Sequence, residues 1–172
     1  KEIKFRYLRR IMEILKASEN YIPAIIALAK RTWHATYSEL VPAGQIDYML
    51  ELFYKKELLS QQMNDPQHHF LIMKDDDVLL GYSHCIELDG KVKLSKLYFA
   101  PEVQGKGYGK QLMQRVFDDT KQAGYSLIEL CVNRGNPAQF FYEKMGFVIT
   151  EEADFPIGDY FMNDYVMQKK LD

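Results

Sequence analysis

Apolar residues recur with two different periods along the chain, and these periods separate expected strands from expected helices. Short apolar or alternating runs predict strands over residues 11–16, 69–74, 78–88, 92–99, 127–132, 147–151 and 160–169. Apolar positions three and four residues apart predict helices over residues 22–37, 46–63, 112–123 and 137–145. The expected order of elements is therefore βααβββαβαββ.

Turn and cap residues mark several boundaries of these elements. Ser18-Glu19-Asn20 offers helix caps just before the first helical run, and Pro42-Ala43-Gly44 interrupts it. Asp89-Gly90 predicts a hairpin between two strands, and Gly146 is a suitable residue to end the last helix. No internal repeat or interdomain linker interrupts this pattern.

Composition is that of an ordinary globular domain. The chain has 172 residues, of which 47% are hydrophobic and 27% charged, enough for one domain with a sizeable core. No apolar run is long enough to span a bilayer, and the start lacks the pattern of a signal peptide. We therefore expect a cytoplasmic protein without a membrane partner. Cys85 and Cys131 are expected to be buried, reduced thiols, and no metal site is predicted.

The first eleven residues differ in charge from the rest. They hold five basic residues and one acidic residue, and we expect an N-terminal extension or loose arm before a domain at residues 12–172. Subtracting them from the totals of 22 basic and 24 acidic residues leaves 17 and 23, a net charge of −6. An acidic domain disfavours nucleic acid as a partner and mildly favours cationic substrates.

Three alternating glycines lie between the strand at 92–99 and the helix at 112–123. The stretch reads Val103-Gln104-Gly105-Lys106-Gly107-Tyr108-Gly109-Lys110. Glycines leave the backbone N–H groups accessible, and a helix start adds unsatisfied donors and partial positive charge. Lys106 and Lys110 add full charges. The expected ligand is a phosphate or a pyrophosphate.

Two familiar phosphate loops are excluded by spacing. A Walker loop requires Gly at position 104 and Ser or Thr at position 111, but both positions are Gln. A dinucleotide fingerprint requires a third Gly where Lys110 stands, and an acid at the end of the next strand. That strand ends in Cys131-Val132-Asn133 instead.

The remaining pattern, Gln104-x-x-Gly107-x-Gly109, resembles the acetyl-CoA pyrophosphate loop of the GNAT-type N-acetyltransferases. A second block follows about thirty residues later and is similar to the family's Ala-x-x-x-Tyr-x-Lys-x-Gly-Phe helix: it runs from Ala138 through Tyr142 and Lys144 to Gly146-Phe147. The two blocks occur in order with a strand between them. The resemblance covers residues 12–172. Two further stretches, residues 33–39 and 158–169, look similar to the branch of the family that includes bacterial spermine/spermidine acetyltransferases.

This resemblance implies an α+β fold and an acetyl-CoA site. The fold would be a mixed, mostly antiparallel seven-stranded sheet with four flanking helices, whose central strands 92–99 and 126–132 splay apart to admit the cofactor. The backbone of Leu97, Tyr98 and Phe99 would pair with the pantetheine arm, and a backbone amide there would polarise the thioester. The residues implied to contact acetyl-CoA in the loop are Gln104, Gly105, Lys106, Gly107, Tyr108, Gly109 and Lys110. Asn136, with Asn133 in reserve, would add a hydrogen bond, although Asn136 also suits a helix N-cap.

The reaction needs an acid for the departing thiolate and a base for the amine. By resemblance, Tyr142 is the acid; the alternative is a core tyrosine. Relatives often carry a glutamate on the strand before the loop, but here that stretch is Lys93-Leu94-Ser95-Lys96. The candidates for the base are Glu39, His34, His84, Glu87 and solvent, and Glu39 is the predicted catalytic residue.

The acceptor is expected between the first two helices and the last hairpin. Its predicted contacts are Trp33, His34, Tyr37, Glu39 and Glu87, with Asp159 and Asp164 as further acids on the hairpin. Aromatic walls and carboxylates suit a polyamine through cation–π and ionic contacts. Protein N-termini or lysines are the alternative acceptors, and a non-catalytic acyl-CoA-binding sensor is the alternative of another class. Family members often form homodimers, but the sequence identifies no interface.

Overall fold

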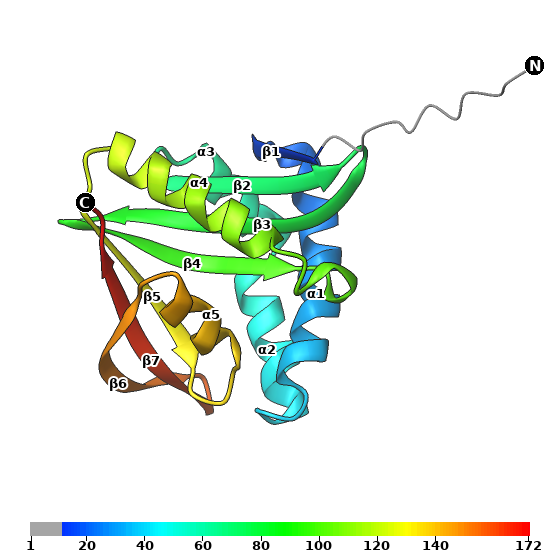
Figure 1. Cartoon of the computed structure of the whole chain (residues 1–172). Helices are drawn as coiled ribbons and strands as arrows, with labels where there is room; N and C mark the ends of the chain where they lie inside the picture. Colours follow the sequence, from blue (N-terminus) through cyan, green and yellow to red (C-terminus); the bar gives the residue numbers. More distant parts are fainter. Residues whose placement is uncertain (1–11) are drawn as a thin grey trace, which may run out of the picture.

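The computed structural model describes residues 12–172, and the predicted arm at residues 1–11 lies outside the described residues. The strands are β1 (Met12–Lys16), β2 (His68–Asp75), β3 (Val78–Leu88), β4 (Lys91–Phe99), β5 (Leu127–Asn133), β6 (Val148–Ile157) and β7 (Tyr160–Lys170). The α-helices are α1 (Ile22–Tyr37), α2 (Ala43–Phe53), α3 (Lys56–Asn64), α4 (Tyr108–Gln122) and α5 (Ala138–Lys144). Two short 3-10 helices, η1 (Glu19–Tyr21) and η2 (Pro101–Val103), precede α1 and the glycine-rich loop (Figure 1).

All seven strands form one sheet in the order β1-β2-β3-β4-β5-β7-β6. Every neighbouring pair is antiparallel except β4 and β5, which run parallel at the centre. The predicted mixed, mostly antiparallel sheet is therefore confirmed.

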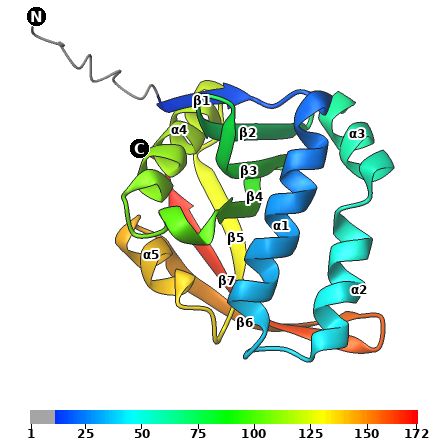
Figure 2. The same cartoon turned by 90° about the vertical axis from the view of Figure 1, so that its right-hand side faces the viewer.

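Two layers of helices cover the two faces of this sheet, and each layer buries its own hydrophobic core. On one face α1, α2 and α3 pack through residues such as Ile25, Ile46 and Leu59. On the other face α4 and α5 pack through residues such as Leu112 and Tyr142. Figure 2 shows α1, α2 and α3 on one side of the strands and α4 and α5 on the other. Burial of apolar surface on both faces holds the three layers together.

Four boundaries and caps of the elements can be compared with the prediction. Residues 12–172 form five α-helices where four were expected, because the stretch at 46–63 breaks at the extended backbone of Lys55 (ψ 135°). Ser18 makes no side-chain cap, because η1 rather than α1 follows it. Strand β6 runs on to Ile157, beyond the predicted end at residue 151, because it pairs with β7 along its full length. Gly146 ends α5 as predicted, with a φ of 91°.

A β-bulge in β4 determines where the sheet opens. Leu94 pairs with Cys85 of β3, and Lys96 pairs with the preceding residue His84, so Ser95 is an extra residue in β4. On its other side, β4 pairs with β5 only at residues 92–94. Beyond the bulge the two strands stay with different partners, β4 with β3 and β5 with β7. The predicted separation of the central strands therefore begins at Ser95.

Candidate active site

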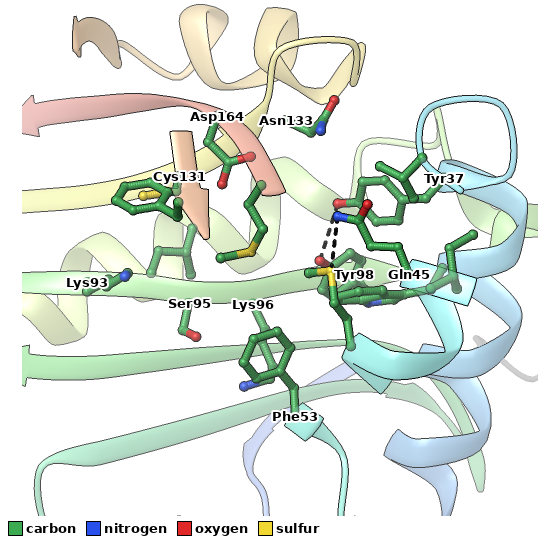
Figure 3. Close-up of a pocket in the computed structure, with 17 residues that line it drawn as sticks. Tyr37, Gln45, Phe53, Lys93, Ser95, Lys96, Tyr98, Cys131, Asn133 and Asp164 are labelled. Atoms are coloured by element: carbon green, nitrogen blue, oxygen red, sulfur yellow. Dashed lines mark hydrogen bonds between the residues drawn. The ribbon is translucent and has the colours of Figure 1, made fainter. Parts of the chain in front are cut away.

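A cavity of about 370 Å³ lies beside the point where β4 and β5 separate. Side chains from α1, α2, β4, β5, β6 and β7 line it, including Trp33, Tyr37, Met49, Phe53, Tyr98, Cys131, Asn133, Phe155 and Met162. Figure 3 shows Lys93, Ser95 and Lys96 along β4, with Asp164 facing them from β7. Its volume and mostly apolar lining are those of a site for a small molecule.

Contacts between α2 and the β6–β7 hairpin close one side of the cavity. The buried side-chain amide of Gln45 donates a 2.8 Å hydrogen bond to the Phe161 carbonyl oxygen. Nearby, the rings of Tyr48 and Tyr160 lie 5.8 Å apart. These contacts fix the last hairpin against the second helix, which is the region where the acceptor was expected.

Aromatic rings form the wall next to α1. The Trp33 ring centroid lies 5.2 Å from that of Tyr37 and 5.9 Å from that of Tyr98. The hydroxyls of Tyr37 and Tyr98 are 3.5 Å apart, and Asn136 Nδ2 donates to the Tyr37 hydroxyl at 3.4 Å. Burial raises the pKa of both tyrosines, so both remain neutral phenols near neutral pH.

Three charged side chains line the same cavity: Lys93, Lys96 and Asp164. Asp164 is 9% exposed, and burial raises the pKa of its carboxyl to about 6, with Arg134 opposing the shift. Lys96 is 8% exposed, and burial together with the charge of Lys93 lowers its pKa to about 8. The Asp164 carboxyl and the Lys96 amine therefore both titrate near neutral pH.

Lys96 has a histidine as its polar neighbour. Its Nζ lies 3.1 Å from Nδ1 of His84, a fully buried residue, and 5.6 Å from the centre of the Tyr54 ring. On its other side, His84 Nε2 lies 2.8 Å from Nδ1 of His68. Burial, followed by the charge of Lys96, lowers the pKa of His84 to about 2, so this imidazole stays neutral.

Tyr142 lies on α5, on the face of the sheet opposite the α1 wall. It is buried against Phe141 and Phe147, with ring centroids 5.4 and 5.8 Å away. Burial, and secondarily the neighbouring Tyr37, raises the pKa of its phenol. Tyr142 is therefore a neutral phenol near neutral pH.

The two predicted asparagines make local backbone contacts. Asn136 Oδ1 accepts from the N–H of Ala138 at 2.9 Å at the start of α5, and its amide reaches Tyr37 as described above. Asn133 Oδ1 accepts from the N–H of Gly135 at 2.9 Å, and Asn133 also lines the cavity. Asn136 thus stabilises the start of α5 while linking it to α1.

The glycine-rich loop lies between η2 and α4 and has room for a ligand. Gly105 and Gly107 have φ values of 77° and 83°, and a Cβ on either would meet no atom within 4 Å. Because α4 begins at Tyr108, its first-turn N–H groups have no acceptor within the helix. The Gln104 side chain donates to the Phe99 carbonyl oxygen at 3.0 Å and ties the loop to the end of β4. These features fit an anionic pyrophosphate.

Three of the predicted acceptor-site residues lie outside this cavity. His34 faces away from it and lies 3.5 Å from Asp47, because its position on α1 points to the solvent side. Glu39 is exposed in the turn after α1. Glu87 accepts hydrogen bonds from His69 at 2.7 Å and Tyr125 at 3.1 Å near the far end of β3. The structure does not bring these three residues to the cavity, and their contact with the acceptor stays a prediction, as does the role of Glu39 as base.

Sequence reasoning missed Lys96, Lys93, Gln45 and Met162 as lining residues. Lys96 was considered only as part of a stretch that lacks a carboxylate, and a strict alternation along β4 would place it on the same face as Leu94. A signal was present: the buried apolar residues fall at even positions up to Leu94 and then shift phase to reach Phe99. Such a phase shift within one strand indicates a bulge.

Comparisons with known proteins agree with this geometry. Residues 37–156 match the family model described as an acetyltransferase (GNAT) domain. An uncharacterised N-acetyltransferase of Mycobacterium tuberculosis is 32% identical over 149 residues, covering 86% of this chain and 96% of that protein. A spermidine N(1)-acetyltransferase of Thermoplasma acidophilum is 29% identical over 166 residues, covering 94% and 98%.

Solved structures show the same fold. The PaiA N-acetyltransferase of Thermoplasma acidophilum, in complex with coenzyme A, superposes with a TM-score of 0.83 at 28% identity, covering 93% of this chain and 99% of that chain. Spermidine N-acetyltransferase of Vibrio cholerae, in complex with CoA and spermine, gives a TM-score of 0.68 at 22% identity, covering 93% and 95%.

The chain belongs to the GNAT acetyltransferase family. It is an N-acetyltransferase that uses acetyl-CoA, as the family match and the coenzyme A complex of its structural relative support. None of the helices in residues 12–172 is long and apolar enough to cross a membrane. Within the same residues, no group of three or more His, Cys, Asp or Glu side chains is arranged to hold a metal ion.

Proposed function

We propose that the enzyme acetylates a small primary amine held in the cavity beside β4, and that a polyamine such as spermidine is its preferred acceptor. The observation that carries this proposal is the position of an aromatic cavity containing Asp164 at the opening between the central strands. The relative named as a spermidine N(1)-acetyltransferase, similar over nearly the whole chain, supports the same substrate class.

The cavity offers a polyamine two kinds of contact. Asp164 provides a carboxylate for a distal ammonium group once its proton is lost. The rings of Trp33, Tyr37 and Tyr98 provide faces for cation–π contacts and for the methylene segments between the nitrogens. A polyamine can place one nitrogen at the strand opening while a second one lies against these groups.

The pyrophosphate of acetyl-CoA would lie on the backbone N–H groups from Gln104 to Lys110, with Lys106 and Lys110 adding charge. From there the pantetheine arm would follow the edge of β4 at Leu97, Tyr98 and Phe99, which beyond Ser95 has β3 but not β5 as a partner. A backbone N–H of this edge would polarise the thioester carbonyl. Asn133 and Asn136 lie at the facing ends of β5 and α5 and would add hydrogen bonds.

Tyr142 would supply the proton for the departing sulfur. The bound acetyl-CoA provides an activated acetyl thioester, and the protein's task is to place the amine and manage two protons. Because burial raises the pKa of Tyr142, the phenol would give up its proton to sulfur only as it regains one from the attacking nitrogen.

A second acceptor class is favoured by one specific observation. Lys93 and Lys96 both line the cavity, and together they would attract a carboxylate. An acceptor that carries an amine and a carboxylate, such as an amino acid or a short peptide, would use these lysines. A protein N-terminus or lysine within a peptide remains the alternative acceptor on this basis.

The test is the release of CoA thiol from acetyl-CoA with a panel of spermidine, spermine, putrescine, amino acids and short peptides. Saturable release with spermidine at the highest kcat/KM supports the polyamine proposal. Saturation by amino acids or peptides, with polyamines at the hydrolysis background, would replace it with the second class. Mass spectrometry of the product then locates the acetyl group.

A further inference from the structure

Three basic side chains form a row across the sheet from the cavity to its edge. Lys96 on β4 lies 3.1 Å from His84 on β3, and His84 lies 2.8 Å from His68 at the start of β2. Lys96 and His84 are cross-strand partners in the sheet register. Lys96 lines the cavity, His84 is fully buried, and His68 is half-buried at the protein surface.

The hydrogen-bond directions in this row are constrained by chemistry. When Lys96 is an ammonium it can only donate, so Nδ1 of His84 must accept. The neutral His84 then carries its proton on Nε2 and donates to Nδ1 of His68. His68 in turn carries its proton on Nε2, the nitrogen that completes the row. One proton entering at Lys96 can therefore leave at His68 by a shift of each imidazole between tautomers.

The surroundings of Lys96 favour loss of its proton. No ion pair of Lys96 with a carboxylate is present in residues 12–172, and the Tyr54 ring and His84 are its close neighbours. The charged and titratable groups around the row are Lys93, Asp164, His69 and Asp65. Burial and Lys93 lower the pKa of Lys96 to about 8, close to the value that suits a general base.

His84 is held in one orientation. Its ring stacks on Phe70 with centroids 4.0 Å apart and an interplanar angle of 8°, and the plane of the His68 ring lies at 20° to it with centroids 5.0 Å apart. The buried imidazole of His84 is fixed between the nitrogens of Lys96 and His68, which suits it to transfer a proton from one to the other.

We propose that Lys96 is the base that deprotonates the acceptor amine, and that His84 and His68 carry the proton out to water. This inference rests on the proposed function, because it needs an amine in the cavity. Lys96 Nζ, as a free amine, takes one proton from the acceptor ammonium. A bond then forms between that nitrogen and the acetyl carbonyl carbon as the C–S bond breaks. The nitrogen loses its second proton to Tyr142, and the Tyr142 proton goes to sulfur. The Lys96 proton leaves through the histidines, so one proton is released for each amide and each CoA thiol formed.

The test compares Lys96→Met and Lys96→Arg with the wild-type enzyme. Both variants should lose at least 100-fold in kcat while keeping the wild-type acetyl-CoA Kd, since methionine has no basic group and arginine keeps its proton. Wild-type turnover with Lys96→Arg would overturn the proposal. Retained acetyl-CoA binding shows that a variant has folded.

A chemically restored lysine separates catalysis from structure. Lys96→Cys treated with 2-bromoethylamine carries an aminoethyl thioether, an amine of lysine length with a lower intrinsic pKa. Activity should return, with the rising limb of kcat/KM against pH shifted to lower pH than in the wild type. The control is wild-type enzyme treated in the same way, because Cys85 and Cys131 are also thiols. An unshifted profile would contradict a role for Lys96 as base.

Two further measurements complete the test. His84→Phe keeps Lys96 and interrupts the row, and should lower kcat at least tenfold; full activity would remove the histidines from the pathway. NMR titration of the Lys96 side chain in the wild-type protein needs no acceptor. A pKa near 8 supports the proposal and a pKa above 10 overturns it, even where no amine in the panel is acetylated and the proposed function itself fails.

Discussion

Leu94 and Lys96 are two residues apart in β4, yet their side chains serve opposite faces of the sheet. Both residues border the cavity, but Leu94 belongs to the core under α4, whereas Lys96 Nζ lies over the ring of Tyr54, which belongs to the core under α1 and α2. The bulge at Ser95 causes this change of face and also marks where β5 leaves β4. One inserted residue therefore opens the sheet and delivers an amine into the opening.

Replacing Lys96 with methionine should stabilise the protein at pH 7. The folded-state pKa of about 8 lies below the ordinary lysine value of 10.5, so the unfolded chain binds more protons between pH 8 and 10.5 and stability rises with pH there. Below pH 8 the buried charge costs about 3 kcal/mol, offset by about 1 kcal/mol for the lost hydrogen bond to His84. We expect Lys96→Met to raise the free energy of unfolding by about 2 kcal/mol.

Urea denaturation at pH 7 and at pH 10 measures this effect. The gain from Lys96→Met should shrink toward pH 10, and Lys93→Met, at a half-buried position, should change stability far less. A Lys96→Met protein less stable than the wild type at pH 7 would show that the buried lysine is a structural group.

Gly107→Glu should weaken acetyl-CoA binding at least tenfold. Gly107 has a φ of 83°, where a side chain is strained, and the new carboxylate would repel the pyrophosphate. Gly124→Glu is the matched control, because Gly124 has a φ of 90°, equally open surroundings and a position after the far end of α4. Isothermal calorimetry with acetyl-CoA distinguishes the two. Equal losses of affinity would mean that backbone strain, not a binding role of the loop, explains the effect.

Tyr142→Phe should lower kcat by about 100-fold while leaving the acetyl-CoA Kd within a factor of two. The phenylalanine keeps the ring contacts with Phe141 and Phe147 and removes only the proton donor. Stopped-flow thiol release provides the rate. Tyr125→Phe, whose hydroxyl bonds Glu87 away from the cavity, should behave as the wild type. Unchanged turnover in Tyr142→Phe would assign this tyrosine to the core alone.

Asp164→Asn should raise KM for spermidine at least tenfold at pH 8 and leave the acetyl-CoA Kd unchanged. The carboxyl pKa of about 6 adds a pH dependence, because the wild-type KM should rise as pH falls through 6 and the charge is lost. The variant should lack this rise. Asp89→Asn, in the exposed turn between β3 and β4, is the control. A wild-type KM in Asp164→Asn would exclude ionic recognition at this position.

Much of the fold could be predicted from the sequence, because the motifs that specify it are local. The glycine-rich loop, the helix that ends at Gly146 and the strand pattern each depend on residues close together in the chain. The separate helices α2 and α3 were not predicted, because lysine at position 55 is not a helix-breaking residue. The extended backbone there results from packing.

The residues that line the cavity could be predicted only in part from the sequence. Trp33 and Tyr37, predicted from the resemblance to polyamine acetyltransferases, line the cavity, whereas His34 and Glu39 are not among its lining residues. Charge alone suggested the acids as contacts, but which way a side chain faces depends on helix rotation and on strand phase. The position of Lys96 depends on strand phase, since the bulge at Ser95 reverses the phase of β4.

The central claim, that the acceptor amine binds in the cavity beside β4, is tested most directly by the acetylation of spermidine when a tryptophan side chain fills that cavity. Met162 lines the cavity, whereas its neighbour Phe161 is exposed, so Met162→Trp and Phe161→Trp form a matched pair on β7. Met162→Trp should lose thiol release and the acetyl-spermidine product while binding acetyl-CoA normally. Phe161→Trp should retain thiol release and product formation. Wild-type acetylation of spermidine by Met162→Trp, with normal acetyl-CoA binding, would show that the acceptor is held elsewhere.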